Sequence, residues 1–226
     1  MKIYDYIMGK TNSSFAYKML KENILKLELK PGEELKEPYL SEILEMSRTP
    51  IREALILLKH EKLIETFPQS GTFVAKIDKE KFKNGRMLRV CIETKMLELA
   101  CESFPDEYLK QLEENLGKQE YILNTTRDYV EFHKLDLEFH KIIFQGVGYL
   151  DLFDITNSNF FDYLRVRQLN SSDKIKDNYV LNGHKKIYEI IKNKTPNIIE
   201  ETLTNHFSRL GDKLDFLIEE YPFYFK

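Results

Sequence analysis

One short stretch of the chain has the two-residue period of β-strands, and everything after it has the period of helices. Residues 63–67 and 72–77 are rich in β-branched and aromatic side chains, and a Pro-Gln-Ser-Gly sequence between them signals a turn. This pattern predicts a β-hairpin. Beyond residue 78 we find apolar residues at helical spacing and no strand signal. The predicted fold class is therefore mainly α.

Three helices are expected before the hairpin. They cover residues 13–28, 36–46 and 48–60, and Pro38 suits the first turn of the second helix because no N–H is missed there. A tight turn joins the second helix to the third, which is the outline of a helix-turn-helix. Three helices followed by a hairpin predict a winged helix-turn-helix domain over residues 10–77.

The second predicted domain, residues 78–226, is an all-α bundle of about six helices. Its long amphipathic stretches are separated by proline, glycine or paired serine residues, which interrupt helices. We expect these helices to cover residues 80–103, 106–124, 126–145, 148–170, 174–192 and 196–220.

The composition restricts the class of protein. Apolar residues make up 42% of the chain and charged residues 31%, which is typical of a soluble globular protein. We find neither an apolar run long enough to span a membrane nor a signal peptide. Cys91 and Cys101 lie about 15 Å apart along one predicted helix, too far for a disulfide. We therefore expect buried, reduced thiols and a cytoplasmic protein.

The charge balance argues against a globally basic nucleic-acid binder. The net charge is −3, and residues 1–78 hold twelve basic and twelve acidic residues. Any contact with DNA must therefore come from a small local cluster of basic side chains at a defined position on the surface. The sequence "SRTPIREAL", Ser47 to Leu55, supplies such a cluster at the start of the third predicted helix.

This cluster has the chemistry of a DNA-reading helix. Arg48 and Arg52 lie one helical turn apart, and arginine reads guanine in the major groove. The hydroxyls of Ser47 and Thr49 lie near the helix N-terminus, where exposed N–H groups favour phosphate. Gly71, at the tip of the predicted hairpin, permits close approach to the DNA backbone.

A structural explanation of the same residues is open. Ser47 can be an ordinary helix N-cap. Arg48 and Arg52 can form a solvated face that pairs with Glu45 or Glu53. The preceding short helix and the following hairpin favour the DNA-binding interpretation over this alternative.

The helical domain contains residues with the spacing of metal ligands. Asp136 and His140 are four residues apart, so both lie on one helix face within reach of one ion. His184 and His206 each lie near one end of another predicted helix. Three imidazoles and a carboxylate suit a borderline divalent metal such as Zn²⁺, Ni²⁺ or Mn²⁺. Facing helices of a bundle are a recurrent place for such a site.

Spacing alone leaves alternatives to this site. His133 precedes Asp136 by three residues and competes with His140 as its partner. A single Asp-x-x-x-His pair is more often a surface hydrogen bond, and His184 or His206 taken alone is more often structural.

The sequence from Leu29 to Ile77 resembles the DNA-binding domain of the GntR superfamily of bacterial regulators. The resemblance rests on Pro31-Gly32, on "SRTPIREAL", on the apolar pair Leu63-Ile64 and on Gly71 in the wing. It implies that the chain works as a homodimer on a palindromic operator in double-stranded DNA. The residues that it implies in DNA contact are Ser47, Arg48, Thr49, Arg52 and Gly71.

The second domain resembles the FCD-type effector domain of FadR-like GntR regulators. The segments that carry this resemblance are "RVCIETKMLELAC", "DLEFH", "GHKKIYEII" and "NHFSRL". It implies a divalent metal, Zn²⁺ in first place with Ni²⁺ or Mn²⁺ as alternatives, whose open positions accept the carboxylate of a small organic acid. The implied metal ligands are Asp136, His140, His184 and His206.

Two arginines are candidates for binding the carboxylate of the effector. Arg89 lies in a segment where the family often carries an arginine that faces the effector, and Arg165 lies on a later helix. A bidentate arginine is a good clamp for a carboxylate. The alternative for Arg89 is a pair with Glu93 on the same helix.

The expected function is transcription regulation, as a repressor whose operator affinity responds to a small carboxylate metabolite. We expect no membrane contact and no enzymatic activity. One alternative is a metal sensor in which the ion is the signal. The other is a metal-dependent hydrolase with Glu138 or Glu189 as general base, which the four protein ligands and the winged helix disfavour.

Overall fold

The structure is a computed structural model of residues 1–226, and it describes all of them except residues 6, 8 and 172–177. The chain forms two compact units, which we describe separately. Unit 1 comprises Met1–Phe82, Asn159–Asn170 and Leu214–Lys226, and unit 2 comprises Lys83–Ser158 and Ser171–Lys213.

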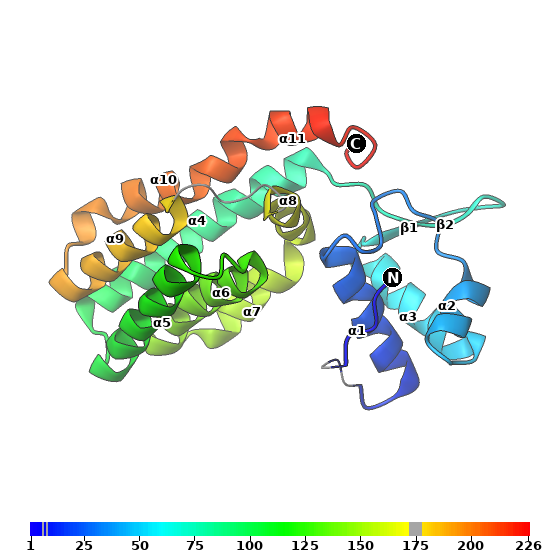
Figure 1. Ribbon diagram of the computed structural model, residues 1–226, viewed down its shortest axis with the longest axis horizontal. Coiled ribbons are helices and arrows are strands. Elements are labelled where there is room, and N and C mark those ends of the chain that lie inside the picture. The colour runs from blue at the N-terminus through cyan, green and yellow to red at the C-terminus, as the bar shows by residue number, and fades with distance from the viewer. Residues whose placement is uncertain (6, 8, 172–177) are drawn as a thin grey trace. The chain divides into compact units, whose positions relative to one another are not determined.

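Unit 1 contains the predicted winged helix-turn-helix (Figure 1). The two strands pair antiparallel, with Ile64 opposite Val74 and Phe67 opposite Gly71, so the predicted hairpin is confirmed. The elements are α1 (Asn12–Leu25), α2 (Glu37–Ile43), α3 (Arg48–His60), β1 (Ile64–Phe67) and β2 (Gly71–Val74).

An apolar core holds these elements together. The buried residues of α1 and α3 recur at three- and four-residue intervals, which is the spacing of one helix face. Pro38 lies in the first turn of α2, as expected. The core residues from the three helices are Ala16, Met19, Leu20, Ile24, Leu40, Ile51, Ala54, Leu55 and Leu58.

A third extended segment flanks the hairpin, which the sequence analysis missed. The N–H of Leu35 donates to the carbonyl of Thr72 over 2.7 Å, and the N–H of Val74 donates to the carbonyl of Glu33 over 2.9 Å. These bonds pair backbone groups on the outer edge of β2 with residues 33–35. The segment is short and lies directly after a Pro-Gly turn, so it carries no recognisable strand period.

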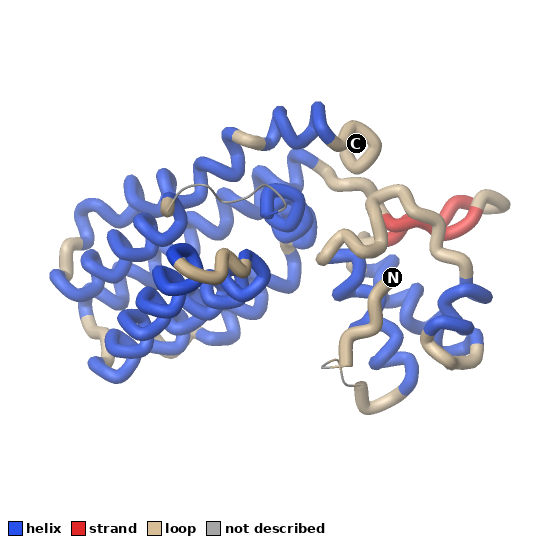
Figure 2. Tube along the Cα trace, in the orientation of Figure 1, coloured by secondary structure: helices blue, strands red, loops and turns tan. Residues whose placement is uncertain are grey.

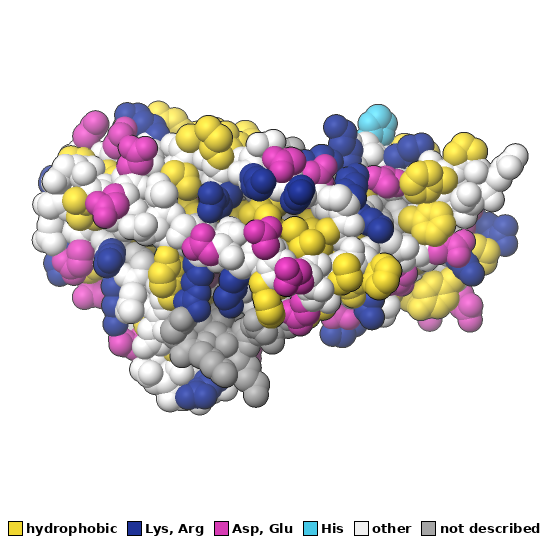
Figure 3. All heavy atoms as spheres, turned by 90° about the horizontal axis from the view of Figure 1, so that it is seen from above, with side chains coloured by type: hydrophobic (Ala, Val, Ile, Leu, Met, Phe, Trp, Pro, Cys, Tyr) yellow, Lys and Arg dark blue, Asp and Glu magenta, His cyan; other side chains and the backbone are white. Residues whose placement is uncertain are grey.

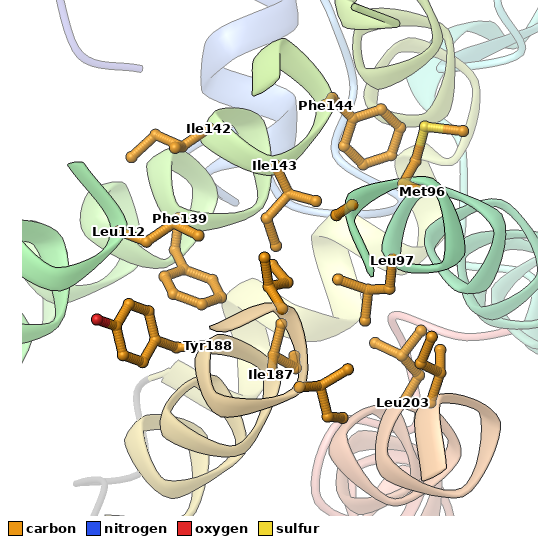
Figure 4. Packing of buried hydrophobic residues seen from close by; sticks show 14 of the residues in the cluster. Met96, Leu97, Leu112, Phe139, Ile142, Ile143, Phe144, Ile187, Tyr188 and Leu203 are labelled. Carbon is orange, nitrogen blue, oxygen red and sulfur yellow. The ribbon is translucent and has the colours of Figure 1, made fainter. Parts of the chain in front are cut away.

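In the part of the chain that the structure describes, the secondary-structure elements of unit 2 are helices, and Figure 2 shows them in blue with loops between them. Its apolar core, seen in Figure 4, joins residues of α4, α5, α6, α9 and α10, among them Leu97, Phe139, Ile187 and Leu203. The prediction of a mainly helical second domain is confirmed. The elements are α4 (Lys79–Glu102), α5 (Asp106–Asn124), α6 (Tyr129–Gly146), α7 (Leu150–Asn159), α9 (Tyr179–Asn193), the 3₁₀ turn η1 (Pro196–Ile198) and α10 (Ile199–Asp212).

Two of the predicted helices are divided. The expected helix 148–170 is α7 and α8 (Phe161–Ser171), and the expected helix 196–220 is η1, α10 and α11 (Leu214–Glu220). The break near Phe160 carries no proline or glycine, whereas Gly211 lies two residues before the break at Lys213. The breaks near residues 160 and 213 coincide with changes of unit, in keeping with a contribution of tertiary packing to where these helices end. Residues 174–177 of the expected helix 174–192 lie outside the described residues.

Helix α8 packs with the winged helix as part of unit 1. Phe161 is buried in the same apolar cluster as α1 and α3, and the Lys21 ammonium lies 4.5 Å from the centroid of its ring. Arg165 is fully buried and donates hydrogen bonds to the backbone carbonyls of Ala75 and Lys76. Unit 1, which contains the predicted winged helix-turn-helix, therefore includes residues far beyond the expected boundary at 77.

The C-terminal residues also belong to unit 1. The N–H of Ile77 donates to the carbonyl of Tyr224 over 2.8 Å, and the N–H of Lys226 donates back to the carbonyl of Ile77 over 3.1 Å. Ile77 and Phe225 form an isolated parallel bridge. The segment directly after the wing is thus paired with the last residues of the chain.

The two cysteines are free thiols with different environments. Cys101 is buried as expected, whereas Cys91 is exposed on α4, so the expectation of two buried thiols is wrong for Cys91. In the part of the chain that the structure describes, every helix is too short or too polar to cross a membrane.

Candidate metal centre and nucleic-acid interface

The four predicted metal ligands meet inside unit 2. Asp136 and His140 come from α6, His184 from α9 and His206 from α10, and one donor atom of each lies within 4.8 Å of all the others. Nε2 of His184 lies 3.3 Å from Oδ1 of Asp136, and Nε2 of His140 lies 3.4 Å from Nε2 of His206. His133, the alternative partner of Asp136, is outside this group.

Burial and the neighbouring imidazoles lower the pKa of His206, which favours the binding of a cation at the centre. Asp136, His140 and His184 are buried, and His206 is partly exposed. Burial, followed by the charges of His184 and His140, lowers the pKa of His206 well below its ordinary value of 6.5. Its imidazole is therefore neutral near pH 7, which is the form that binds a metal.

A carboxylate lies behind His140. Oε2 of Glu93, on α4, lies 2.6 Å from Nδ1 of His140, and Oε1 accepts a hydrogen bond from Nε of Arg89 over 2.6 Å. Burial alone would raise the pKa of Glu93, but the charges of His140 and Arg89 outweigh it, so the net pKa is lowered. Glu93 is thus held as a buried carboxylate between two positive or polar groups.

An amide chain lies behind His184. Oε1 of Gln119, on α5, lies 2.8 Å from Nδ1 of His184. Nε2 of Gln119 donates to Oδ1 of Asn115 over 2.7 Å, and Nδ2 of Asn115 donates to the carbonyl of Leu135 and to Oε2 of Glu138. Glu138, considered above as a catalytic base, therefore accepts a hydrogen bond from Asn115.

Sequence reasoning missed Asn115 and Gln119. Both are buried on the inward face of α5, four residues apart, among Leu112, Leu116 and Ile122. Two buried carboxamides in an apolar stripe need partners. That break in the stripe was the available signal, and it shows that polar groups face α5 without showing which ones.

The close approach of α9 to His206 depends on a missing side chain. A Cβ atom on Gly183 would lie 2.3 Å from Nδ1 of His206, which is closer than atoms can pack. Glycine at this position therefore leaves room for the His206 ring. The donor set of three imidazoles and one carboxylate, together with the neutral ring of His206 and the polar partners behind the other two rings, fits a divalent metal such as zinc.

The two arginines expected at the effector are placed differently. Arg89 is buried beside the centre, where it is paired with Glu93 and lies 4.7 Å from the centroid of the Phe207 ring. Arg165 belongs to unit 1, where its guanidinium contacts Asp162 and two backbone carbonyls. The donors of Arg165 thus serve acceptors within unit 1, whereas the four predicted metal ligands belong to unit 2.

The residues predicted to contact DNA lie on the surface of unit 1. Ser47 is the N-cap residue of α3, and the side chains of Ser47, Arg48, Thr49 and Arg52 are exposed. Nε of Arg52 donates to Oε2 of Glu37 over 2.8 Å, rather than to Glu45 or Glu53. Such an exposed pair contributes little stability and is easily exchanged for another partner.

The wing presents a narrow polar tip. Gly71 has φ +120° and Gln69 has φ +63°, so the turn uses conformations that favour glycine at the first strand residue. Pro68, Gln69 and Ser70 are exposed. On the molecular face that Figure 3 shows, basic and acidic side chains are interspersed.

A winged helix-turn-helix joined to a helical domain is the architecture of a DNA-binding regulator. The sequence profile described as "Bacterial regulatory proteins, gntR family" matches residues 12–74, and the profile described as "FCD domain" matches residues 86–209, more than half of the chain. The chain therefore belongs to the GntR family of transcriptional regulators, in the group that carries an FCD domain.

The chain is similar to several known regulators over nearly its whole length. The HTH-type transcriptional repressor RspR of Escherichia coli K12 is 26% identical over 204 residues, covering 90% of this chain and 89% of that protein. A regulator in an unstable DNA locus of Streptomyces ambofaciens is 27% identical over 207 residues, covering 92% and 86%.

The solved structure of E. coli McbR/YncC has the same fold, with a TM-score of 0.73, 19% identity and coverage of 94% of this chain and 100% of that one. These families and relatives are transcriptional regulators, so the prediction that the chain is not an enzyme is confirmed.

Proposed function

We propose that this regulator is a cytoplasmic homodimeric repressor whose affinity for a palindromic operator responds to a small organic acid bound at a metal. The observation that carries the proposal is the meeting of four donor atoms from three helices within 4.8 Å. Three of the ligands are buried and His206 is partly exposed, so an added ligand can reach the cation site on the side of His206.

The DNA-binding step uses the exposed start of α3. Arg48 and Arg52 read base edges in the major groove, while Ser47 and Thr49 bind phosphate at the helix N-terminus. Gly71 lets the wing approach the DNA backbone closely. The exposure of all four α3 side chains supports this assignment.

The effector step uses the centre in unit 2. Asp136, His140, His184 and His206 would hold the ion, with Zn²⁺ in first place and Ni²⁺ or Mn²⁺ as alternatives. When bound, the ion supplies a positive charge that attracts the carboxylate of the effector. Arg89, whose Nε serves Glu93, carries further N–H donors on a planar guanidinium and is the arginine that we propose for effector contact.

Regulation requires the effector to bind the two states of the protein unequally. A small organic acid that prefers one arrangement of the dimer shifts the population toward it, and the operator affinity changes by the same coupling free energy. For a shift of tenfold in operator affinity this free energy is about 1.4 kcal/mol.

The test combines metal content with operator binding by the full chain. Purified protein is expected to retain one metal per chain after dialysis, and His206→Ala is expected to lose most of it. Small carboxylates added to the loaded protein are then screened for a change in operator affinity at fixed salt. Full metal occupancy in His206→Ala contradicts the ligand assignment.

A metal sensor is the second candidate, and the four protein donors favour it because they fill a tetrahedral shell. In a sensor the ion must exchange and must itself change operator binding. Metal that stays bound through dialysis, together with a response only to an added organic acid, excludes the sensor.

A further inference from the structure

The three ligand imidazoles differ in what lies behind them. Nδ1 of His140 faces the carboxylate of Glu93 at 2.6 Å, and Nδ1 of His184 faces the carbonyl oxygen of Gln119 at 2.8 Å. Nδ1 of His140 makes this contact without hydrogen-bond geometry, and Nδ1 of His206 has no hydrogen-bond partner among the residues that the structure describes. Two ligands are thus supported from behind by acceptors, and the third is not.

The direction of the hydrogen bonds behind His184 follows from one backbone carbonyl. The carbonyl of Leu135 can only accept, so the atom of Asn115 that faces it is the amide nitrogen. Oδ1 of Asn115 then faces Gln119, which must donate its own amide nitrogen to it. This leaves Oε1 of Gln119 for His184, whose Nδ1 must carry the proton.

The contact behind His140 orients its ring in the same way. Oε2 of Glu93 lies 2.6 Å from Nδ1, so Nε2 is the ring nitrogen left for the cluster. In both rings an acceptor oxygen faces Nδ1, which leaves Nε2 for a metal. Nε2 of His184 indeed lies 3.3 Å from Asp136, and Nε2 of His140 lies 3.4 Å from His206, both inside the cluster of donor atoms.

We propose that Glu93 and Gln119 are positioning residues of the metal centre, which fix the tautomer and the ring orientation of His140 and His184 before the ion binds. The proposal rests on the proposed function only in assuming that the centre holds a metal. Asn115 and Arg89 act one step further out, since they orient Gln119 and Glu93.

The chain of bonds also returns to the helix that carries two of the ligands. Leu135 directly precedes Asp136 on α6, so the carbonyl that orients Asn115 moves together with the ligand carboxylate. Helix α5 is thereby fastened to α6 and α9 through polar groups at the level of the centre. Loss of this chain is expected to loosen the ligand geometry without removing a ligand.

The experiment measures metal binding by the full chain rather than operator binding. Glu93→Gln keeps the shape of the side chain and removes its charge, and Gln119→Met removes the acceptor at nearly the same volume. Zn²⁺ affinity is measured by competition with a chromophoric chelator at fixed pH. We expect each variant to lose about 10- to 100-fold in affinity.

Matched controls lie on the same helices. Glu98→Gln on α4 changes an exposed surface pair with Lys95, and Gln111→Met on α5 lies two turns before Gln119. Both are expected to bind Zn²⁺ within about threefold of the wild type. Gln119→Glu keeps an acceptor toward His184 but loses the donor to Asn115, and it is expected to bind Zn²⁺ more tightly than Gln119→Met.

Two further readouts separate positioning from a general loss of stability. Thermal unfolding in excess chelator measures the metal-free protein, and the absorption spectrum of the Co²⁺-substituted protein reports its coordination geometry. A positioning role changes the spectrum and lowers Zn²⁺ affinity beyond any change in metal-free stability.

Unchanged Zn²⁺ affinity in both variants, with His206→Ala still losing metal, overturns this inference and leaves the metal centre intact. A wild-type protein that binds neither Zn²⁺ nor Co²⁺ overturns the inference and the proposed metal-dependent function together.

Discussion

The guanidinium of Arg165 donates a hydrogen bond to the backbone carbonyl of Ala75, although the two residues are 90 positions apart in the chain. The same guanidinium contacts Lys76 and Asp162, and the side chain is fully buried. This arginine therefore joins α8 to the chain segment that leaves the wing. A guanidinium suits this position because its planar fork can serve several acceptors at once.

Replacement of Arg165 by methionine is expected to destabilise the protein strongly. The variant leaves two backbone carbonyls without this donor and Asp162 without its buried partner, and loss of one partner of a buried pair costs about 3–5 kcal/mol. Urea unfolding of the full chain measures the change. Lys36→Met is the control, because its pair with Glu34 is exposed and contributes at most about 1 kcal/mol. A loss of under 1 kcal/mol in the Arg165 variant contradicts the structural role.

Replacement of Arg48 by alanine is expected to weaken operator binding with the fold intact. The side chain is exposed at the first residue of α3, so its removal costs the fold little. Loss of a bidentate contact with a base costs about 1–3 kcal/mol per site. A gel-shift titration at fixed salt measures the affinity, with Lys110→Ala on the exposed face of α5 as the control. Equal affinity of the Arg48 variant and the wild type would remove Arg48 from the interface.

Replacement of Gly183 by alanine is expected to displace His206 and to lower the affinity for metal. The added Cβ would lie 2.3 Å from Nδ1 of His206, so the ring or α9 must move. Gly117→Ala on α5 is the matched control, because its Cβ has no neighbour among the described residues within 4 Å. Because alanine is a better helix former than glycine by about 1 kcal/mol, the control variant Gly117→Ala is expected to keep its fold and its metal. Elemental analysis after dialysis compares the two variants, and equal metal content in both contradicts this prediction.

The metal-free protein is expected to lose stability as the pH falls below about 6.5. Burial and the neighbouring imidazoles hold the pKa of His206 below its ordinary value of 6.5, so the unfolded chain binds this proton more readily than the folded chain. The contribution of His206 to stability is complete above pH 6.5 and declines below it. Urea unfolding in excess chelator at pH 7.5 and pH 5.5 measures the decline.

The variant His206→Gln supplies the control for the pH measurement. It lacks the titrating imidazole, so its stability should change less between the two pH values than that of the wild type. An equal change in both proteins would assign the pH dependence to other groups. The lowered pKa of Glu93 acts in a more acid window, below its ordinary value of 4.5, and does not interfere.

The fold and the pairing of Asp136 with His140 were predictable from local signals, whereas His184 and His206 entered the predicted ligand set through the resemblance to the FCD-type domain. Helix period, a turn sequence and the four-residue spacing of Asp136 and His140 depend on neighbours along the chain. The supports of the centre were not predictable in this way. Gln119 meets His184 across 65 positions, and only the packing of α5 against α9 decides that partner.

The partners of Arg165 were likewise not predictable from its sequence neighbours. An arginine on an amphipathic helix is compatible with an effector contact, a surface pair or a backbone clamp, and its sequence neighbours do not distinguish these. The division of the expected helix 148–170 decided its position, since α8 belongs to unit 1 while α7 up to Ser158 belongs to unit 2. Without a proline or glycine at the break, the sequence carries no mark of that division.

The assignment of α8 and the last residues to unit 1 means that the polypeptide passes between the two units four times. A fragment that stops at Phe82 would contain every residue of the helix-turn-helix and the wing, yet it would lack Phe161, Arg165 and Phe225. We therefore expect that the winged helix-turn-helix of this regulator does not fold stably as a fragment of residues 1–82. A chimaera that exchanges DNA-binding domains between relatives must therefore include α8 and the C-terminal tail together with residues 1–82. Without these segments, the exchanged domain will expose apolar surface that they cover in the intact chain.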